Sequence, residues 1–310
     1  MNYVLITPVK NEQKYIRQTL DSVVAQTELP LAWVIIDGGS QDKTRDIVKE
    51  YAAKYPWIYL KYQLHFSDKG GHTNVSIAMK EAYEYLKQSG IPFDYVANID
   101  ADQVLEPNVC EGIISALKKN LGVGAASGQV YNPNGNPDTY PEGEISNKRI
   151  YNRGAFERVG GYPITRYSFD SVVLAKMRIA NWDIKTYPEY KIHNLRKDMG
   201  IEHTSVIKSN LQWGRSKYYL GYSFSLLVMG CGYLVLKGEI GKSIGVFIGW
   251  MDSWINHDEV IADKEVWNHF HNERLSQILD TMWIEPRHIY LVIGFVMVFI
   301  AGILAWRFWQ

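Results

Sequence analysis

The first 128 residues are organised as short β-branched runs that alternate with longer amphipathic stretches of helical periodicity. This alternation is typical of an α/β fold, in which helices connect the strands of a mainly parallel sheet and flank it. We expect strands at residues 3–6, 32–37, 57–63 and 95–100. We expect helices at residues 12–26, 44–54, 74–88 and 171–181.

Charge and cysteine content exclude several classes of protein. Lys plus Arg and Asp plus Glu are equal at 33 each, so no excess of positive charge indicates a nucleic-acid partner. Cys110 and Cys231 lie far apart, which argues against a disulfide framework or a structural zinc site. Residues 1–10 lack a signal-peptide pattern and predict a strand, so we expect the fold to begin at once, in the cytosol.

The last third of the chain is more apolar. Residues 288–306 carry no Lys, Arg, Asp or Glu and predict a transmembrane helix, the alternative being a buried C-terminal helix of a soluble domain. Residues 218–236 and 244–255 predict interfacial, re-entrant or transmembrane helices. The expected division is an α/β domain at 1–205, a membrane-associated helical region at 206–285 and a transmembrane helix at 286–310.

A pair of carboxylates follows the fourth expected strand. Asp100 and Asp102 occupy alternate positions on a strand-to-loop turn, where two carboxylates can converge on one hard cation. A metal ion held there would neutralise a diphosphate leaving group. The alternative is an ordinary solvated turn, because Asp-x-Asp triplets are common.

Two further motifs follow the first and second expected strands, where open α/β sheets bind their ligands. Asp37-Gly38-Gly39-Ser40 allows close approach of the backbone to a ligand, and Asp37 can accept hydrogen bonds from a base or ribose. Glu12, in Pro8-Val9-Lys10-Asn11-Glu12, can act in the same way. The alternatives are a loop in which Asp42 or Ser40 caps a helix, and a glutamate that merely favours a helix start.

Two more side chains are candidates for chemistry. Asp170 opens an expected helix and can serve as a general base towards an acceptor hydroxyl, or can be a helix N-cap. His193 lies beside Lys191, Arg196 and Lys197, a pattern that suits a third metal ligand with diphosphate contacts. The alternative for His193 is a structural histidine.

These motifs occur in the order typical of the inverting family 2 glycosyltransferases, which the chain resembles over about residues 1–198. The matching segments are Thr7-Pro8-Val9-Lys10-Asn11-Glu12, Asp37-Gly38-Gly39-Ser40 with Asp42 and Thr44, Asp100-Ala101-Asp102, Gly160-Gly161-Tyr162 and Phe169-Asp170. The resemblance implies the GT-A fold of nucleotide-diphospho-sugar transferases. It also implies a divalent metal, Mn2+ or Mg2+, and a nucleotide-sugar donor, with a UDP-sugar as the default and a GDP-sugar possible.

The resemblance also implies roles for single residues. Donor binding falls to Pro8, Glu12, Asp37, Ser40, Lys69, Asn74 and Asp100, to which the cationic segment adds Arg196. Metal binding falls to Asp100, Asp102 and, as in some relatives, His193. Asp170 corresponds to the general base, although this chain has Phe169 where the family more often has glutamate.

The expected function is inverting transfer of a single sugar to a hydroxyl or phosphate acceptor, lipid-linked or an envelope glycan precursor, on the cytoplasmic face of a membrane. Processive polysaccharide synthases of the family typically carry Gln-x-x-Arg-Trp, whereas this chain has Gln212-Trp213-Gly214-Arg215-Ser216. A processive synthase and a catalytically silent membrane scaffold remain alternatives. A nucleotidyltransferase usually carries a glycine-rich phosphate loop after its first strand, and that loop is missing here.

Overall fold

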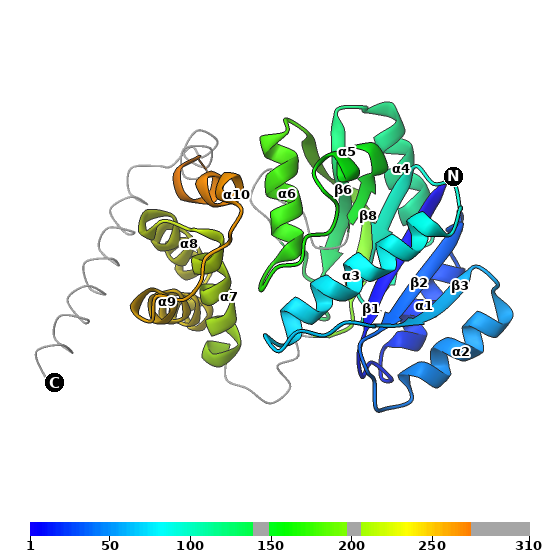
Figure 1. The fold of residues 1–310 in the computed structure, drawn as a ribbon, viewed down its shortest axis with the longest axis horizontal. Helices are drawn as coiled ribbons and strands as arrows, with labels where there is room; N and C mark the ends of the chain where they lie inside the picture. Colours follow the sequence, from blue (N-terminus) through cyan, green and yellow to red (C-terminus); the bar gives the residue numbers. More distant parts are fainter. Residues whose placement is uncertain (139–148, 197–205, 274–310) are drawn as a thin grey trace, which may run out of the picture. The chain divides into compact units, whose positions relative to one another are not determined.

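The computed structural model describes residues 1–138, 149–196 and 206–273 (Figure 1). The chain forms two compact units, Met1–Gly200 and Ile201–Gln310. The three-part division at residues 205 and 285 stays a prediction. The expected transmembrane helix at 286–310 lies outside the described residues.

The first unit is an α/β structure. Its strands are β1 (Tyr3–Val9), β2 (Ala32–Asp37), β3 (Ile58–Tyr62), β4 (Tyr95–Asn98), β5 (Gln103–Leu105), β6 (Val123–Tyr131), β7 (Arg149–Asn152) and β8 (Asp183–Asn194). Its helices are α1 (Ile16–Val24), α2 (Thr44–Lys54), α3 (Gly71–Gln88), α4 (Val109–Lys119), α5 (Arg153–Arg158) and α6 (Phe169–Ile179).

All these strands form one sheet, in the order β3-β2-β1-β4-β7-β6-β8-β5. The half from β3 to β4 is parallel, as the alternating sequence pattern predicts. The other half is mixed, because β7 runs antiparallel to β4 and β6, and β5 runs antiparallel to β8. The expectation of a mainly parallel sheet is therefore confirmed only in part. Strands β5 and β7 are too short for their alternation to be visible in the sequence.

Each face of the sheet carries its own hydrophobic core. Tyr3 and Leu5 of β1 belong to the core that includes residues of α1 and α4, whereas Val4 and Ile6 belong to the core that includes residues of α3 and α6. This is the two-residue periodicity of a strand buried on both faces. Strand β1 is therefore held from both faces of the sheet.

Element boundaries decide where the polar motifs lie. The expected strand 32–37 and helix 44–54 are confirmed. Strand β1 is longer than expected and α1 begins at Ile16 instead of residue 12, which leaves Glu12 in a turn that Tyr15 N–H closes by donating to Glu12 O at 3.0 Å. Strand β4 ends at Asn98, which leaves Asp100 and Asp102 on a turn before β5.

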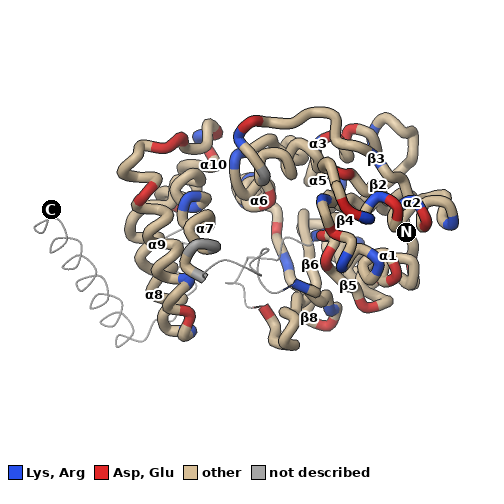
Figure 2. Tube along the Cα trace, turned by 90° about the horizontal axis from the view of Figure 1, so that it is seen from below, with Lys and Arg blue, Asp and Glu red and all other residues tan. Residues whose placement is uncertain are grey.

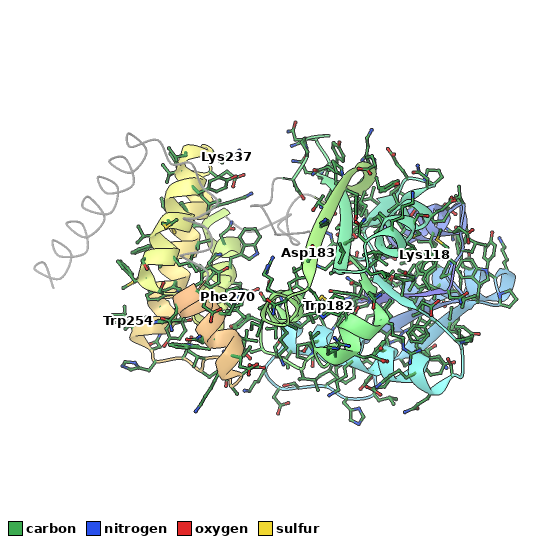
Figure 3. All side chains as sticks on the ribbon, turned by 90° about the horizontal axis from the view of Figure 1, so that it is seen from above. Lys118, Trp182, Asp183, Lys237, Trp254 and Phe270 are labelled. Carbon is green, nitrogen blue, oxygen red and sulfur yellow. The ribbon has the colours of Figure 1, made fainter. Side chains whose placement is uncertain are left out.

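The second unit is helical in its described part. Its elements are α7 (Val206–Leu220), α8 (Phe224–Leu236), α9 (Ile240–Ile255), α10 (Lys264–Asn268) and a π-helical turn (His269–Glu273). In Figure 3, Lys237 and Trp254 mark the ends of α8 and α9. Helices α7 and α9 approach closely at glycines, since a Cβ on Gly214 would lie 2.1 Å from Val246 O and one on Gly249 would lie 2.0 Å from Leu211 O.

The helices of this unit differ in length from the two apolar stretches expected from the sequence. Residues 218–236 are divided at Gly221, and 244–255 belong to the 16-residue α9. Within residues 1–138, 149–196 and 206–273, no helix combines the length and apolar character needed to cross a membrane. Whether α8 and α9 lie in a membrane interface stays a prediction.

Candidate functional site

The loops that follow β1 and β2 are joined by hydrogen bonds. Asn11 N–H donates to Ser40 Oγ at 2.9 Å, and Glu12 N–H donates to Thr44 Oγ1 at 2.7 Å. Because β1 and β2 are neighbouring parallel strands, both loops leave the same edge of the sheet. The two sequence motifs that were expected to bind a nucleotide therefore lie together.

Asp37 ends β2 and is buried. Its carboxylate accepts hydrogen bonds from Gly39 N–H at 3.2 Å, from Ser40 N–H at 3.1 Å and from Arg45 Nε at 2.7 Å. These bonds fix the loop and hold the guanidinium beside it. Pro8, half-buried, lies on the neighbouring strand β1. The nucleotide roles of Pro8, Asp37 and Ser40 stay predictions.

The N-cap of α2 is neither Asp42 nor Ser40, so the helix-cap interpretation of this loop is wrong about the residue. The N-cap of α2 is Lys43, whose side chain makes no cap bond, but Asp42 Oδ1 accepts from Thr44 N–H at 3.0 Å. Asp42 Oδ2 also accepts from Gln13 N–H at 3.1 Å. Burial opposes ionisation, yet the hydrogen bonds from Thr44 and Gln13 hold the pKa of the Asp42 carboxyl below its usual value.

The turn that carries Asp100 and Asp102 is fastened from α1. Thr19 Oγ1 donates to Ala101 O at 2.8 Å and accepts from Gln103 N–H at 3.1 Å. The buried Gln103 side chain also accepts from Asp100 N–H at 3.1 Å. The turn is therefore held by its neighbours, and both aspartates stay half-buried at the edge of the sheet.

Arg196, two residues beyond β8, joins the loop after β1 to this turn. Its Nη2 donates to Glu12 Oε2, and its Nε lies 3.3 Å from Asp102 Oδ2. Its guanidinium carbon lies 5.2 Å from the ring centroid of Tyr15. Figure 2 shows acidic and basic positions interspersed around α1, β4 and β5. Sequence motifs 184 residues apart thus meet at one place.

The charges of this cluster affect one another. Burial raises the pKa of the Glu12 carboxyl above its usual value; Arg196 opposes that rise, while Asp102 and Asp100 add to it. Burial lowers the pKa of Arg196, but Glu12 and Asp102 outweigh it, so the pKa of the guanidinium is raised overall. Arg196 therefore offsets part of the repulsion that Asp102 and Asp100 exert on Glu12.

His193 does not join the two aspartates. Its Nε2 lies 3.5 Å from Glu106 Oε1, and its ring stacks on Tyr131 with centroids 5.4 Å apart. No group of three or more His, Cys, Asp or Glu side chains within residues 1–138, 149–196 and 206–273 is arranged to hold a metal ion. The predicted three-residue metal set of Asp100, Asp102 and His193 is therefore not assembled, because His193 lies further back along β8, opposite Val104.

Lys69 and Asn74 lie around the start of α3. Asn74 Oδ1 accepts from Ser67 N–H at 2.7 Å, which fixes the loop after β3, and Asn74 O accepts from Gln63 Nε2 at 3.0 Å. Lys69 is exposed on the turn before Gly70, whose φ of +91° favours glycine. The donor-binding roles of both residues stay predictions.

Asp170 is the second residue of α6, and the helix N-cap is Ser168, so the N-cap interpretation of Asp170 is wrong. Its Oδ2 lies 3.3 Å from Nη2 of the buried Arg149. Arg149 is paired in the sheet with Asn98, the last residue of β4, and Asp100 follows two residues later. Asp170 is thereby linked to the strand end that carries the aspartate turn.

Taken together, this edge of the sheet offers oxygen ligands for a hard cation, a guanidinium for a phosphate, and a carboxylate outside the cluster for proton transfer. The sequence profile of Glycosyl transferase family 2 matches residues 4–175. The chain belongs to this family. It therefore carries a glycosyltransferase domain.

Curated relatives of this family 2 chain match it over part of their length. An uncharacterised glycosyltransferase of Escherichia coli, YibD, is 30% identical over 120 residues, which cover 38% of this chain and 31% of YibD. Chondroitin synthase of E. coli is 28% identical over 42% of this chain and 17% of that protein. The chain thus spans less than a third of the length of these relatives.

Solved glycosyltransferase structures have the same fold. TarS residues 1–349 of S. aureus, in complex with UDP-GlcNAc, superpose with a TM-score of 0.53 at 14% identity, covering 95% of this chain and 79% of that one. The mannosyltransferase PcManGT of Pyrobaculum calidifontis, in complex with GDP-Man and Mn2+, gives 0.51 at 16% identity, with 98% and 82% covered. These likenesses support the GT-A type of α/β fold expected from the sequence.

Sequence reasoning missed two arginines of this family 2 domain. Arg149 contacts Asp170, and Arg45 contacts Asp37, but neither stands in a motif. Arg45 lies eight residues beyond its partner, and Arg149 lies 21 residues before its own. A buried or half-buried carboxylate needs a cationic partner, and this need was the signal in the sequence. It does not say which Arg or Lys is the partner.

Proposed function

We propose that this family 2 glycosyltransferase moves a single sugar from a nucleotide-diphospho-sugar to a hydroxyl or phosphate acceptor, with inversion at the anomeric carbon. The observation that carries the proposal is the meeting of Glu12, Asp102 and Arg196 at the carboxyl ends of β1, β4 and β8. Asp170 is linked through Arg149 to the end of the same strand β4.

The donor is proposed to be a UDP-sugar, with a GDP-sugar as the second choice. TarS and PcManGT, which share the fold, carry UDP-GlcNAc and GDP-Man in their solved complexes. In this chain Pro8, Asp37 and Ser40 would hold the nucleoside. Glu12 would bind the ribose or base, Asp100 would lie at the ribose and diphosphate, and Lys69 and Asn74 would border the donor.

A divalent cation, Mn2+ or Mg2+, fits the residues of the aspartate turn. The Asp100 and Asp102 carboxylates are hard oxygen ligands at the sheet edge, and Mg2+ in such sites is usually held by one or two carboxylates together with substrate phosphates. Such a cation would supply neutralisation of the diphosphate leaving group. His193 is not included among its ligands, because it contacts Glu106 and Tyr131 instead.

The chain's own residues would perform the remaining steps. Asp170 would take the proton of the acceptor hydroxyl while the acceptor oxygen attacks the anomeric carbon. The bond from that carbon to the diphosphate breaks on the opposite face, which inverts the configuration. Arg196 would donate hydrogen bonds to the departing diphosphate in the fork geometry that suits phosphate oxygens. Arg149 would hold Asp170 in place.

The acceptor is proposed to be lipid-linked or an envelope glycan precursor, used at the cytoplasmic face of a membrane. Support comes from the second unit, where apolar side chains including Leu236, Ile240, Trp254 and Ile255 are exposed. Large apolar and aromatic side chains at a surface are typical of helices that lie in a membrane interface.

A processive polysaccharide synthase is the second candidate, because relatives of the chain include proteins named chondroitin synthase and poly-beta-1,6-N-acetyl-D-glucosamine synthase. Residues 212–216 of this chain stand where processive synthases carry Gln-x-x-Arg-Trp, and they take part in helix packing. Gly214 lies against α9, and Arg215 donates to Asp252 at 2.7 Å. This use of the segment favours transfer of a single sugar.

The test is release of nucleoside diphosphate by the full chain, purified in detergent. A panel of UDP- and GDP-sugars is supplied with Mn2+ or Mg2+, with and without a membrane-lipid extract. Asp102→Ala is compared with Asp183→Ala, a matched control in the same unit. Figure 3 labels Asp183 where β8 begins, at the other end of this strand from Arg196, and the residue is exposed.

The expected result is metal-dependent and lipid-dependent release with one donor, lost in Asp102→Ala and kept in Asp183→Ala. Long polymer among the products would favour the processive synthase. A folded protein that bound no donor of the panel would support the silent scaffold and contradict the proposed activity.

A further inference from the structure

Arg196 has an unusual position for a residue that is expected to bind a diphosphate. Its guanidinium contacts two carboxylates, Glu12 and Asp102, from two different loops. Leu195 N–H donates to Asp102 O at 2.8 Å, which anchors the backbone beside the turn. The guanidinium also lies over the ring of Tyr15.

The contact is more than a surface ion pair. The side chains of Arg196, Glu12 and Asp102 are only 24%, 16% and 22% exposed, so water screens their charges less than it would on an open surface. The contact also joins residues from three parts of the chain, after β1, after β4 and after β8. Arg196 therefore neutralises part of a cluster whose carboxylates would otherwise repel one another.

The proposed metal site uses the same Asp102 carboxylate. A divalent cation that entered alone would compete with the guanidinium for this carboxylate and would leave Arg196 with fewer anionic partners. A diphosphate that arrived with the cation would change this balance, because its oxygens offer the guanidinium a new charged partner of matching geometry. Moving Arg196 away from Asp102 therefore costs more free energy when the metal binds alone than when it binds together with a nucleotide.

We propose that Arg196 is an exchangeable internal cation, which holds Glu12 and Asp102 in the absence of donor and moves to the diphosphate when metal and nucleotide bind. Metal and nucleoside diphosphate then bind cooperatively, and the coupling passes through this one side chain. By linkage, each ligand raises the affinity for the other by the same factor. The inference rests on the proposed function, since it takes Asp102 as a metal ligand.

A structural pin is the simpler explanation of the same contact, and it predicts a different result. If Arg196 only fastened the loops, its removal would lower stability and would weaken or leave unchanged the binding of metal alone. If Arg196 competes with the metal, its removal makes the binding of metal alone tighter. Metal affinity in the absence of nucleotide therefore separates the two explanations.

The experiment measures Mn2+ binding to the full chain from the electron paramagnetic resonance signal of free Mn2+. Wild type is compared with Arg196→Gln, without nucleotide and with saturating UDP or GDP. Arg215→Gln is the matched control, because it removes a guanidinium that contacts Asp252 within the second unit. For wild type we expect weak binding of Mn2+ alone and clear tightening by one of the two nucleotides.

For Arg196→Gln we expect Mn2+ alone to bind about tenfold more tightly than to wild type, and the tightening by nucleotide to shrink by a similar factor, within the usual range of coupling between sites. Arg215→Gln should match wild type. Mn2+ should also raise the melting temperature of Arg196→Gln more than that of wild type, because the metal replaces the missing cation.

The outcomes separate the inference from the function on which it rests. Binding of Mn2+ alone that is no tighter in folded Arg196→Gln, or equal cooperativity in both proteins, would overturn the inference and leave the proposed function standing. Absence of both metal and nucleotide binding in wild type would overturn both. If Arg196→Gln does not fold, Arg196→Lys replaces it: its single ammonium cannot reproduce the guanidinium fork, so Mn2+ alone should still bind more tightly than to wild type.

Discussion

The candidate site contains two arginine–carboxylate contacts that differ in how they are built. Arg149 belongs to a strand inside the sheet, and its side chain is 3% exposed. Arg196 lies beyond the end of β8, and its side chain is 24% exposed. The first cation is enclosed by its surroundings, whereas the second is the one that we propose to exchange partners.

The difference in burial between Arg149 and Arg196 suits the different roles proposed for their carboxylate partners. Under the proposed mechanism Asp170 would need one orientation throughout the proton transfer, so a cation buried in the sheet would suit it. The Glu12 and Asp102 loops would meet a metal and a diphosphate that enter and leave, so a movable cation suits them. A rigid counter-ion and an exchangeable one thus lie at the same edge of the sheet.

The largest effect should come from Asp170→Asn, which keeps the size of the side chain and removes its charge. Sugar transfer should fall by about 10³-fold, because an amide cannot accept the proton of the acceptor hydroxyl. Product formation from donor and acceptor measures this loss. Binding of nucleoside diphosphate should be unchanged, since Asp170 lies outside the Glu12–Asp102–Arg196 cluster. Transfer at near the wild-type rate by a folded variant would show that Asp170 is not the base.

The next effect concerns the contact between Arg149 and Asp170. Arg149→Met should lower the free energy of unfolding by about 2 kcal/mol, because it leaves Asp170 half-buried without its cation. Urea unfolding with and without Asp170→Asn measures the coupling between the two positions. The double variant should lose less stability than the two single variants together. Additive losses would mean that Arg149 is not the counter-ion of Asp170.

The elements of the first half of the domain could be read from the sequence because each carries a strong local pattern. Strand β2 and helix α2 were predicted to the residue, since one is a continuous apolar run and the other has clear amphipathic spacing. The antiparallel strand β7 could not, because its Arg149-Ile150-Tyr151-Asn152 shows no usable alternation. Its place in the sheet is decided by pairing with β4 and β6.

For the site too, the sequence predicted some features and not others. Glu12, Asp102 and Asp170 stand in motifs with a fixed place after a strand or at a helix start, so the sequence could name them. Whether they meet depends on contacts across long separations, such as the 184 residues between Glu12 and Arg196. His193 shows the limit of local reasoning, because its cationic neighbours suggested a metal ligand while β8 places it against Glu106 and Tyr131.

The smallest expected effect is the pH dependence of stability that Glu12, a partner of Arg196, contributes. The pKa of Glu12 is raised by burial and by Asp102 and Asp100, despite Arg196. A raised folded-state pKa means that the stability gained by protonating Glu12 is present below its unfolded value of 4.5 and is lost as pH rises through the folded value. In metal-free buffer, the free energy of unfolding of wild type minus that of Glu12→Gln should therefore fall as pH rises from 4.5 towards neutrality. Urea unfolding at several pH values measures this slope. A difference that rises with pH would mean that the ion pair with Arg196 outweighs burial and the neighbouring carboxylates.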